Sequence, residues 1–429
     1  MEKLSLFLEQ KLMPLGERIN KIKLLQVVRD SMMPMIPLII SGSMVLLLLN
    51  FPWIDKVVPA GILTELKNIL VPLFNGTMSI ISLFISFLIG YNYSKLTNKD
   101  ENPIFAGLIS LVAFIIVTPS TITVGKEAVG GVIPTDYLGS KGMFVAIIIG
   151  YLFAKLFVYL MSGKLKITLP EGVPPMVAKS FESLIPAFLT LVVVCIFNYI
   201  MTLTPFGNVH SVIGEMIQKP LLAIGTGLPA LLISQGLIQL LWFFGLHGDN
   251  LVGAVMEPIL TTAGMENLAA YEAGKSLPYI ITQQFASLFV VIAFISLVIA
   301  IVIVARSNRL KEVGKLSLLP ACFCISEPIV FGLPIVMNVI LVIPWVIVRP
   351  VFGIITYAFM YFGLCPAPTG VTLPWTTPPI LSGFLATNSI MGAVVQIICI
   401  IVGVLIFIPF VKVLDKAYRK EEAEKQQGE

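Results

Sequence analysis

Charged side chains are scarce in this 429-residue chain. Asp, Glu, Lys and Arg make up 12% of it, about half of their share in ordinary soluble domains. Hydrophobic residues make up 57%, and the mean hydropathy is +0.95. This composition excludes a soluble globular protein and predicts an all-α polytopic membrane protein. No basic face with interleaved aromatic residues occurs, so nucleic acid is not an expected partner.

Several catalytic signatures are also missing. The chain has no Walker A loop, no kinase glycine-rich loop, no His-Glu-x-x-His motif and no nucleophile elbow. Nucleotide-driven transport and membrane proteolysis by this chain therefore have no support. Its five cysteines all lie in apolar surroundings, and the close pair Cys322 and Cys324 has no second pair or nearby His to complete a zinc site. We expect neither a metal nor another cofactor.

Long apolar runs predict about ten transmembrane helices. The clearest runs are residues 32–51, 69–91, 104–118, 143–163, 181–203, 220–244, 277–305, 339–363 and 380–411. Lys and Arg concentrate before the first run, around residues 164–179 and 306–315, and after the last, which predicts cytoplasmic termini. Residues 204–220 read as an amphipathic connector between an N-terminal domain (1–203) and a C-terminal domain (221–429).

The stretch 318–338 places one carboxylate, Glu327, inside an apolar run. A carboxylate at a bilayer centre costs about 3 kcal/mol, so it normally faces protein or a watery cavity and marks a functional site. The stretch also contains three prolines, Pro320, Pro328 and Pro334. They disfavour a continuous helix and predict a broken or re-entrant element. The alternative is an interfacial carboxylate, with Ser326 capping a helix that begins at Pro328.

Residues 247–264 are half apolar and interrupted by Gly and Pro, which predicts a second re-entrant element. Both elements contain a Glu-Pro pair, in VMEPIL (255–260) and ISEPIV (325–330). Six residues do not establish a repeat. Paired interrupted segments are nevertheless the sequence feature that points to a transporter's binding site.

Other polar residues among the apolar runs are candidate ligands. His247 ends an aromatic-rich run, and a neutral imidazole both donates and accepts hydrogen bonds, which suits a hydroxyl; it could equally bond the backbone where a helix ends. Trp375 could stack on a sugar ring or anchor the membrane interface. Trp242 would lie near the face of His247 if the helix continued. Gln283 and Gln284 could bind sugar or bond between helices, and His210 reads as a surface residue.

Five motifs, in this order, resemble the membrane-embedded enzyme IIC of the bacterial sugar phosphotransferase system, in its lactose/cellobiose/chitobiose family. They are YLGSKGMFVAIIIGYLFAK (137–155), LPEGVPPMVAKSFESLIPAF (169–188), LWFFGLHGDN (241–250), ISEPIVFGLPIVMN (325–338) and LPWTTPPILSG (373–383). Within the family, the resemblance points to the diacetylchitobiose transporters and implies diacetylchitobiose or cellobiose as the sugar. Two departures bear on substrate preference: ASLFVVIAF (286–294) replaces a glycine-rich stretch, and Cys324 stands where relatives often have Asn.

The resemblance implies a homodimer in the bacterial cell membrane, held together by its N-terminal spans, whose C-terminal half carries a disaccharide. A separate phosphorylated IIB protein, supplied by IIA, would phosphorylate the sugar at C6 from a phosphocysteine. We expect Glu327 and His247 to converge on that hydroxyl as the catalytic pair, with the burial of Glu327 offset by hydrogen bonds from the sugar. Trp375 and Trp242 would contact the sugar rings, and Asn250 and Gln284 would bind peripheral groups.

Two other hypotheses remain open from the residues. In an ion-coupled secondary sugar transporter, Glu327 would carry a proton. In a membrane enzyme, Glu327 and His247 would act as an acid/base pair on a bound sugar.

Overall fold

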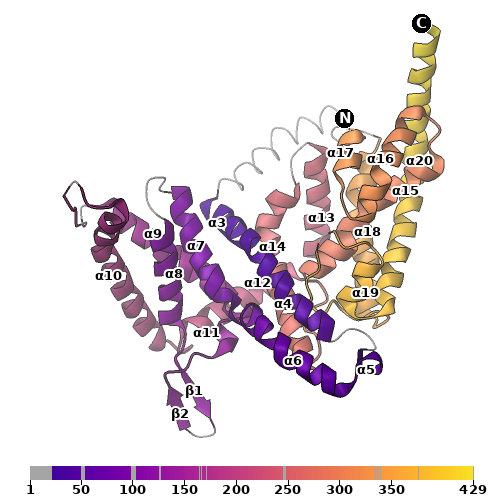
Figure 1. Ribbon diagram of the computed structural model, residues 1–429. Coiled ribbons are helices and arrows are strands. Elements are labelled where there is room, and N and C mark those ends of the chain that lie inside the picture. The colour runs from indigo at the N-terminus through magenta and orange to yellow at the C-terminus, as the bar shows by residue number, and fades with distance from the viewer. Residues whose placement is uncertain are drawn as a thin grey trace. The chain divides into compact units, whose positions relative to one another are not determined.

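The computed structural model describes residues 22–49, 54–97, 103–124, 127–163, 165, 167–170, 172–244, 248–333, 335, 338, 340–374 and 376–428. Helices dominate these residues (Figure 1). Seven are long and apolar enough to cross a membrane: Lys23–Gly42, Ala60–Thr97, Ser140–Ser162, Pro175–Thr202, Phe285–Val304, Val342–Tyr361 and Ile390–Glu424. A further pair, Val209–Gly225 and Leu228–Phe243, bends by 68° at its break. The multi-pass prediction is confirmed. By length and composition these residues contain seven or eight candidate spans, so the predicted count of about ten is not confirmed.

The chain forms two compact units. The first comprises Met1–Gly42 and Val71–Leu221, and the second comprises Ser43–Leu70 and Leu222–Glu429. Three helices contribute to both units, α4 (Ile36–Leu49), α6 (Ala60–Asn75) and α12 (Lys219–Gly225).

The remaining elements of the first unit are α3 (Lys23–Met32), η2 (Met33–Met35), η3 (Met78–Ile80), α7 (Ile81–Thr97), α8 (Pro103–Val117), β1 (Thr121–Val124), β2 (Glu127–Gly130), η4 (Thr135–Tyr137), η5 (Ser140–Gly142), α9 (Met143–Ser162), α10 (Pro175–Thr202), α11 (Val209–Ile213) and η6 (Gly214–Gln218). Helix α12 (Lys219–Gly225) follows directly. The antiparallel β1–β2 hairpin is the one departure from the all-α expectation among the described residues. It lies in the segment 119–142, between the two predicted apolar runs 104–118 and 143–163.

The core of the first unit is the packing of α7 on α8 and α9. Gly90 of α7 lets the helices approach closely, because a Cβ there would lie 2.4 Å from the carbonyl oxygen of Ala106 on α8. Ser110 of α8 donates to the carbonyl of Gly150 on α9 at 2.9 Å. Small residues at such contacts are what helix packing in a membrane requires, since lipid gives apolar side chains no reason to cluster.

His210 is not a surface residue. Its side chain is buried against the rings of Phe114 and Tyr137, and its Nε2 lies 3.0 Å from Thr118 Oγ1. The polar residues around it in the sequence suggested a solvated connector. In the structure the connector is one helical stretch from Val209 to Gly225, and His210 is on the face that packs inside the unit.

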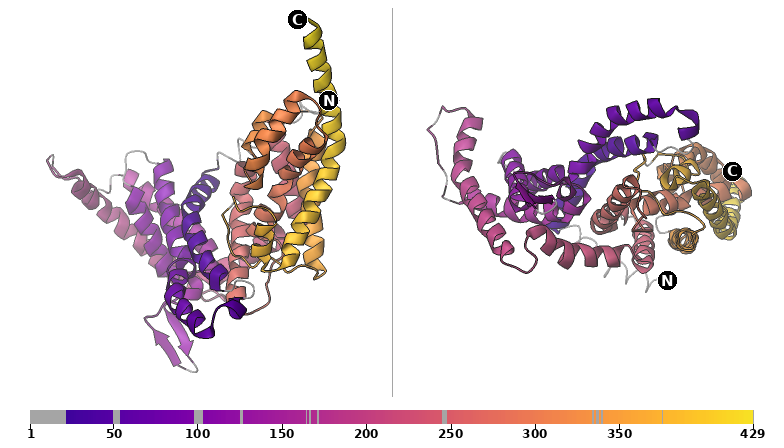
Figure 2. Two further views of the ribbon diagram at one scale, coloured as in Figure 1. Left: turned by 45° about the vertical axis from the view of Figure 1, so that its right-hand side comes forward. Right: turned by 90° about the horizontal axis from the view of Figure 1, so that it is seen from below.

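The second unit holds α5 (Ile54–Val57), α13 (Leu228–Phe243), α14 (Gly248–Glu272), η7 (Phe285–Val290), η8 (Val291–Ala293), α15 (Phe294–Val304), α16 (Asn308–Cys322), α17 (Glu327–Gly332), α18 (Val342–Tyr361), α19 (Leu381–Thr387) and α20 (Ile390–Gly428). Helix α13 packs on α14 and α18, and α20 packs on α15, α18 and α19. The C-terminal part of α20 continues past the other helices of its unit (Figure 2).

Two segments of this unit differ from expectation. Residues 248–272 form one continuous 25-residue helix, in place of an interrupted element, so α14 accommodates the one backbone donor that Pro258 lacks. Conversely, the run 380–411 is broken. Asn388 adopts a left-handed conformation (φ 50°) between α19 and α20, a conformation that Asn tolerates better than most residues.

Helix α20 holds the start of α16. The carboxylate of Asp415 accepts hydrogen bonds from the backbone N–H groups of Arg306 (2.8 Å) and Ser307 (2.7 Å). Arg309 of α16 lies over the ring of Tyr418, with its Cζ 4.3 Å from the ring centroid. These contacts satisfy donors at a helix start that would otherwise lack partners. They also fix α16, whose C-terminal end at Cys322 leads to Glu327.

Candidate functional site

The stretch around Glu327 is broken, as predicted. Helix α16 ends at Cys322, and α17 begins at Glu327 itself. Between them, Cys324 adopts a left-handed conformation (φ 60°). The N–H of Cys324 donates to the carbonyl of Ala321 (3.0 Å), and the N–H of Ile325 donates to the carbonyl of Pro320 (3.0 Å). This pair of bonds is the Schellman ending of a helix, which normally has Gly or Asn at the left-handed position. The motif explains why Asn is a suitable residue where this chain has Cys324.

Ser326 occupies the position before α17 but makes no capping hydrogen bond with its side chain, and Pro328 is in the first turn. The alternative of an interfacial carboxylate expected a helix that begins at Pro328 and is capped by Ser326. The helix is present, but it begins one residue earlier, at Glu327, and Ser326 does not cap it. The backbone of Glu327 is described and its side-chain placement is not.

The loop of residues 365–379 lies against this turn. Cys324 Sγ lies 3.5 Å from the carbonyl oxygen of Thr377 as a hydrogen-bond donor. Thr377 is two residues after Trp375, which lies outside the described residues. The structure thus brings the turn that leads to Glu327 next to the loop that carries Trp375.

Two buried amide side chains hold the same loop. Asn267 of α14 donates to the carbonyl oxygens of Tyr279 (2.7 Å) and Pro368 (2.8 Å). Gln284 donates from Nε2 to the carbonyl of Gly370 (2.8 Å) and to Thr372 Oγ1 (3.0 Å). Both N–H groups of Gln284 are therefore used by protein, while its buried Oε1 has no hydrogen-bond partner among the described residues. That oxygen is packed against Gly264 of α14, where a Cβ would lie 2.5 Å from it.

The end of this loop is fixed by Gln396 of α20. Its Oε1 accepts from the backbone N–H groups of Ile380 (2.6 Å) and Gly383 (3.0 Å), and its Nε2 donates to the carbonyl of Leu288 (2.7 Å). Ile380 has a left-handed φ of 75°. Such a conformation is strained for a β-branched residue and persists only where surrounding contacts hold it.

A second group of polar residues lies where α13 meets α14. Trp242 was expected near the face of His247 only if one helix continued through both residues, and this condition is not met, because α13 ends at Phe243 and α14 begins at Gly248. His247 lies outside the described residues. Asn250 is exposed in the first turn of α14. The structure therefore places Trp242 and Asn250 on either side of the segment that carries His247.

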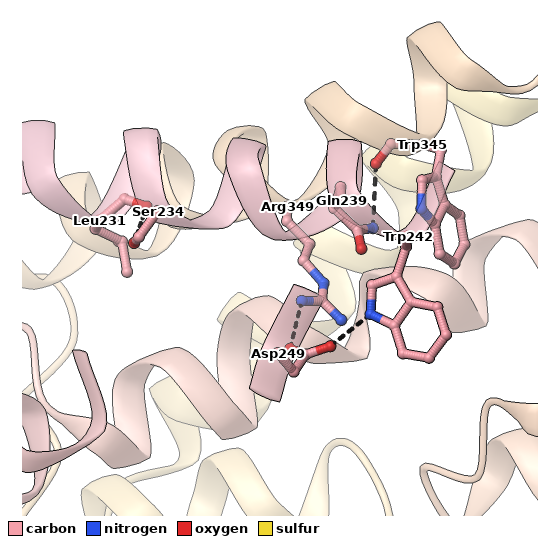
Figure 3. A network of polar contacts seen from close by, with 7 residues as sticks. All are labelled: Leu231, Ser234, Gln239, Trp242, Asp249, Trp345 and Arg349. Carbon is pink, nitrogen blue, oxygen red and sulfur yellow. Dashed lines mark hydrogen bonds and ion pairs between the residues drawn. The ribbon is translucent and has the colours of Figure 1, made fainter. Parts of the chain in front are cut away.

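Asp249 connects three helices at this point (Figure 3). Its Oδ2 accepts from the indole N–H of Trp242 on α13 at 2.7 Å, and its Oδ1 lies 3.0 Å from Arg349 Nη1 on α18. The Arg349 side chain is 7% exposed. An arginine at the middle of a membrane helix costs about 2.5–3.5 kcal/mol on insertion scales, so such residues are paired and usually functional.

Sequence reasoning missed Arg349. The available signal was a single cation in an apolar run, VIPWVIVRPVFGII (342–355), by the same argument that selected Glu327. What the sequence did not offer was its partner, which is 100 residues away.

Two of the cysteines, Cys324 and Cys365, do not suit a phosphoryl carrier. Burial raises the pKa of Cys324 to about 11 and that of Cys365 to about 11. Since the thiolate is the nucleophile, these two thiols are poorly reactive at neutral pH.

Comparison with known proteins places the chain among sugar transport components. Residues 29–348 match the family model "Phosphotransferase system, EIIC". The chain is 43% identical to the oligo-beta-mannoside-specific EIIC component of Bacillus subtilis, over 98% of this chain and 96% of the relative. It is 36% identical to the cellobiose-specific EIIC component of Geobacillus stearothermophilus, over 98% and 96%.

A solved structure shows the same fold. The transporter ChbC, the IIC component of the N,N'-diacetylchitobiose-specific phosphotransferase system, superposes with a TM-score of 0.90 at 34% identity, over 97% of this chain and 99% of that one.

Proposed function

Because the chain belongs to the EIIC family of the phosphotransferase system, we propose that it carries a β-linked disaccharide across the cell membrane and presents the sugar's C6 hydroxyl to a phosphorylated IIB partner. The observation that carries this proposal is the near full-length match to an EIIC component at 43% identity. The sugars for which these three relatives are named, oligo-β-mannosides, cellobiose and diacetylchitobiose, are all β-linked.

The proposed reaction needs an acceptor held in line with the phosphoryl donor. The C6 oxygen of the sugar would form a bond to phosphorus as the phosphorus–sulfur bond of a phosphocysteine on IIB breaks, leaving a thiolate on IIB. Glu327 would orient the hydroxyl and accept its proton, and His247 would hold the same oxygen. Phosphoryl transfer depends mainly on positioning and charge stabilisation, so a membrane chain contributes by holding the acceptor.

We propose four residues as ligands of the sugar rings and their substituents. Trp242 and Trp375 would contact the sugar rings with the apolar faces of their indoles. Asn250 would bind a peripheral group, and Oε1 of Gln284, which has no partner among the described residues, would accept a hydrogen bond from a sugar hydroxyl. An N-acetyl substituent and a bare hydroxyl can use the same amides, so these residues favour no single disaccharide.

The assembly we propose is a homodimer with both termini in the cytoplasm and with the N-terminal spans, residues 1–203, in the dimer contact. Residues 204–220 would connect them to a transport domain, residues 221–429. Cross-links that join residues 331–411 of two copies, and not the earlier spans, would contradict this arrangement. So would labelling of a C-terminal tag from outside intact cells.

Vesicles distinguish this function from ion-coupled transport. Right-side-out membrane vesicles containing the protein, IIA, IIB and the general phosphoryl carriers should accumulate sugar phosphate when phosphoenolpyruvate is inside. Uptake should continue after a protonophore dissipates the proton gradient. Accumulation of free sugar that stops with the protonophore would instead support the secondary transporter with Glu327 as proton carrier, and conversion of sugar by the chain alone would support an enzyme.

The substrate can be ranked by thermal stabilisation of the purified protein. A ligand at about 100 times its dissociation constant adds about 2.7 kcal/mol to the free energy of unfolding when only the folded state binds it. We expect this shift from at least one of mannobiose, cellobiose and diacetylchitobiose, and none from maltose, an α-linked control. An equal response to maltose would contradict selection of β-linked sugars.

A further inference from the structure

We propose that Arg349 is a positioning residue for sugar binding: through Asp249 it fixes the ring of Trp242 and the first turn of α14, which carries Asn250. This inference rests on the proposed function, because Trp242 and Asn250 are sugar ligands only if that function holds. Arg349 itself is the buried partner of Asp249, whose two oxygens face Arg349 and Trp242 (Figure 3).

The position of Asp249 links the pair to the predicted ligands. Asp249 directly precedes Asn250 in the first turn of α14, and Trp242 is in the last turn of α13. The bond from the Trp242 indole N–H to Asp249 is 2.7 Å long. A tryptophan that stacks on a sugar ring must present a fixed plane, and its N–H bond removes the rotation that would tilt that plane.

The backbones around Asp249 are held as well. A Cβ on Gly248 would lie 2.2 Å from the carbonyl oxygen of Ile238, so the start of α14 lies directly against α13. Gln239 of α13 donates to the carbonyl of Trp345 on α18 at 3.1 Å. Trp345 is one helical turn before Arg349, so this bond sets the register of α18 on α13 beside the ion pair. With both backbones fixed, the side chain of Arg349 determines where the Asp249 carboxylate lies.

Variants of both residues separate positioning from simple stabilisation. Removing Asp249 leaves the charge of Arg349, whose side chain is 7% exposed, without its partner and destabilises the fold, whereas replacing both partners by apolar residues of similar volume is often nearly neutral. A purely structural pair would therefore recover both stability and sugar affinity in the double variant. A positioning pair would recover stability alone, because neither side chain is left to orient Trp242 and the first turn of α14.

The test measures melting temperature and the dissociation constant for the preferred disaccharide of the panel, using the full chain in detergent. The variants are Asp249→Leu, Arg349→Met and the double variant, in which position 249 no longer offers an acceptor to the Trp242 indole N–H. The matched control is Ser234→Ala. Ser234 is buried on α13, and among the described residues its hydroxyl donates only to the carbonyl of Leu231 in its own helix, at 2.9 Å.

We expect each single variant to lower the melting temperature and to raise the dissociation constant at least tenfold. The double variant should melt near the parent temperature and keep the tenfold loss of affinity, and Ser234→Ala should match the parent in both. A double variant that binds like the parent would overturn the inference. A parent that binds no sugar of the panel would instead overturn the proposed function on which the inference depends.

Discussion

Replacing Glu327 with Gln should lower the rate of sugar phosphorylation by a factor of about 100 or more, which is the range for loss of a general base. Gln keeps the shape of the side chain and loses its charge and its basicity. Sugar binding should weaken as well, because a hydrogen bond to a carboxylate is stronger than one to a neutral amide. Rates of sugar-phosphate formation in vesicles with phosphorylated IIB, together with binding by calorimetry, measure the two effects separately.

The control for this variant is Glu312→Gln on the neighbouring helix α16. The Glu312 side chain is 65% exposed and pairs with Lys315 at 3.1 Å, an exposed contact of little energetic weight. The Glu312→Gln variant should support sugar phosphorylation at the parent rate. If Glu327→Gln also does so while remaining folded, the catalytic carboxylate has been wrongly assigned.

Replacing Gly370 with Ala should destabilise the protein by about 3 kcal/mol or more and abolish sugar binding. Gly370 has a φ of +88°, and a Cβ there would lie 2.0 Å from the carbonyl oxygen of Gly264 and 2.7 Å from the backbone nitrogen of Leu268. Backbone atoms of a packed helix cannot move aside cheaply. The loop would have to leave α14, and Gln284 would lose the Gly370 carbonyl to which it donates.

Gly363→Ala separates the clash from the backbone conformation. Gly363 also has a positive φ, +73°, but a Cβ there would meet nothing within 4 Å. This variant should lose only about 1–2 kcal/mol, the cost of a left-handed residue with a side chain. Thermal unfolding of the two purified variants checks the comparison. Equal melting temperatures would mean that Gly370 is not held against α14 as described.

The features that could be predicted from the sequence are those encoded over short distances. Long apolar runs gave the multi-pass class, and the prolines near Glu327 gave the break between α16 and α17. Local signals failed where tertiary contacts decide the outcome. Pro258 reads as a helix breaker, yet α14 continues through it, and the polar neighbours of His210 suggested exposure although the packed face of its helix buries it.

The candidate site was predicted only in part, for the same reason. Carboxylates, imidazoles and indoles in apolar surroundings can be found by residue type, and Gln284 was selected in this way. Its bonds to Gly370 and Thr372 could not be found, because they join residues 86 and 88 positions apart. Arg349 and Asp249 likewise become a pair only once α13, α14 and α18 have packed together.

The claim that Glu327 holds the C6 hydroxyl can be tested by combining a protein variant with a sugar analogue. The dissociation constants of the preferred disaccharide and of its analogues deoxygenated at C6 of either ring are measured for the parent and for Glu327→Gln. If the Glu327 carboxylate bonds the C6 hydroxyl, the parent should bind the analogue that lacks this hydroxyl about tenfold or more weakly than the disaccharide. For Glu327→Gln the difference in affinity should be much smaller. Equal losses of affinity for the parent and the variant on both analogues would contradict the claim that Glu327 holds the C6 hydroxyl.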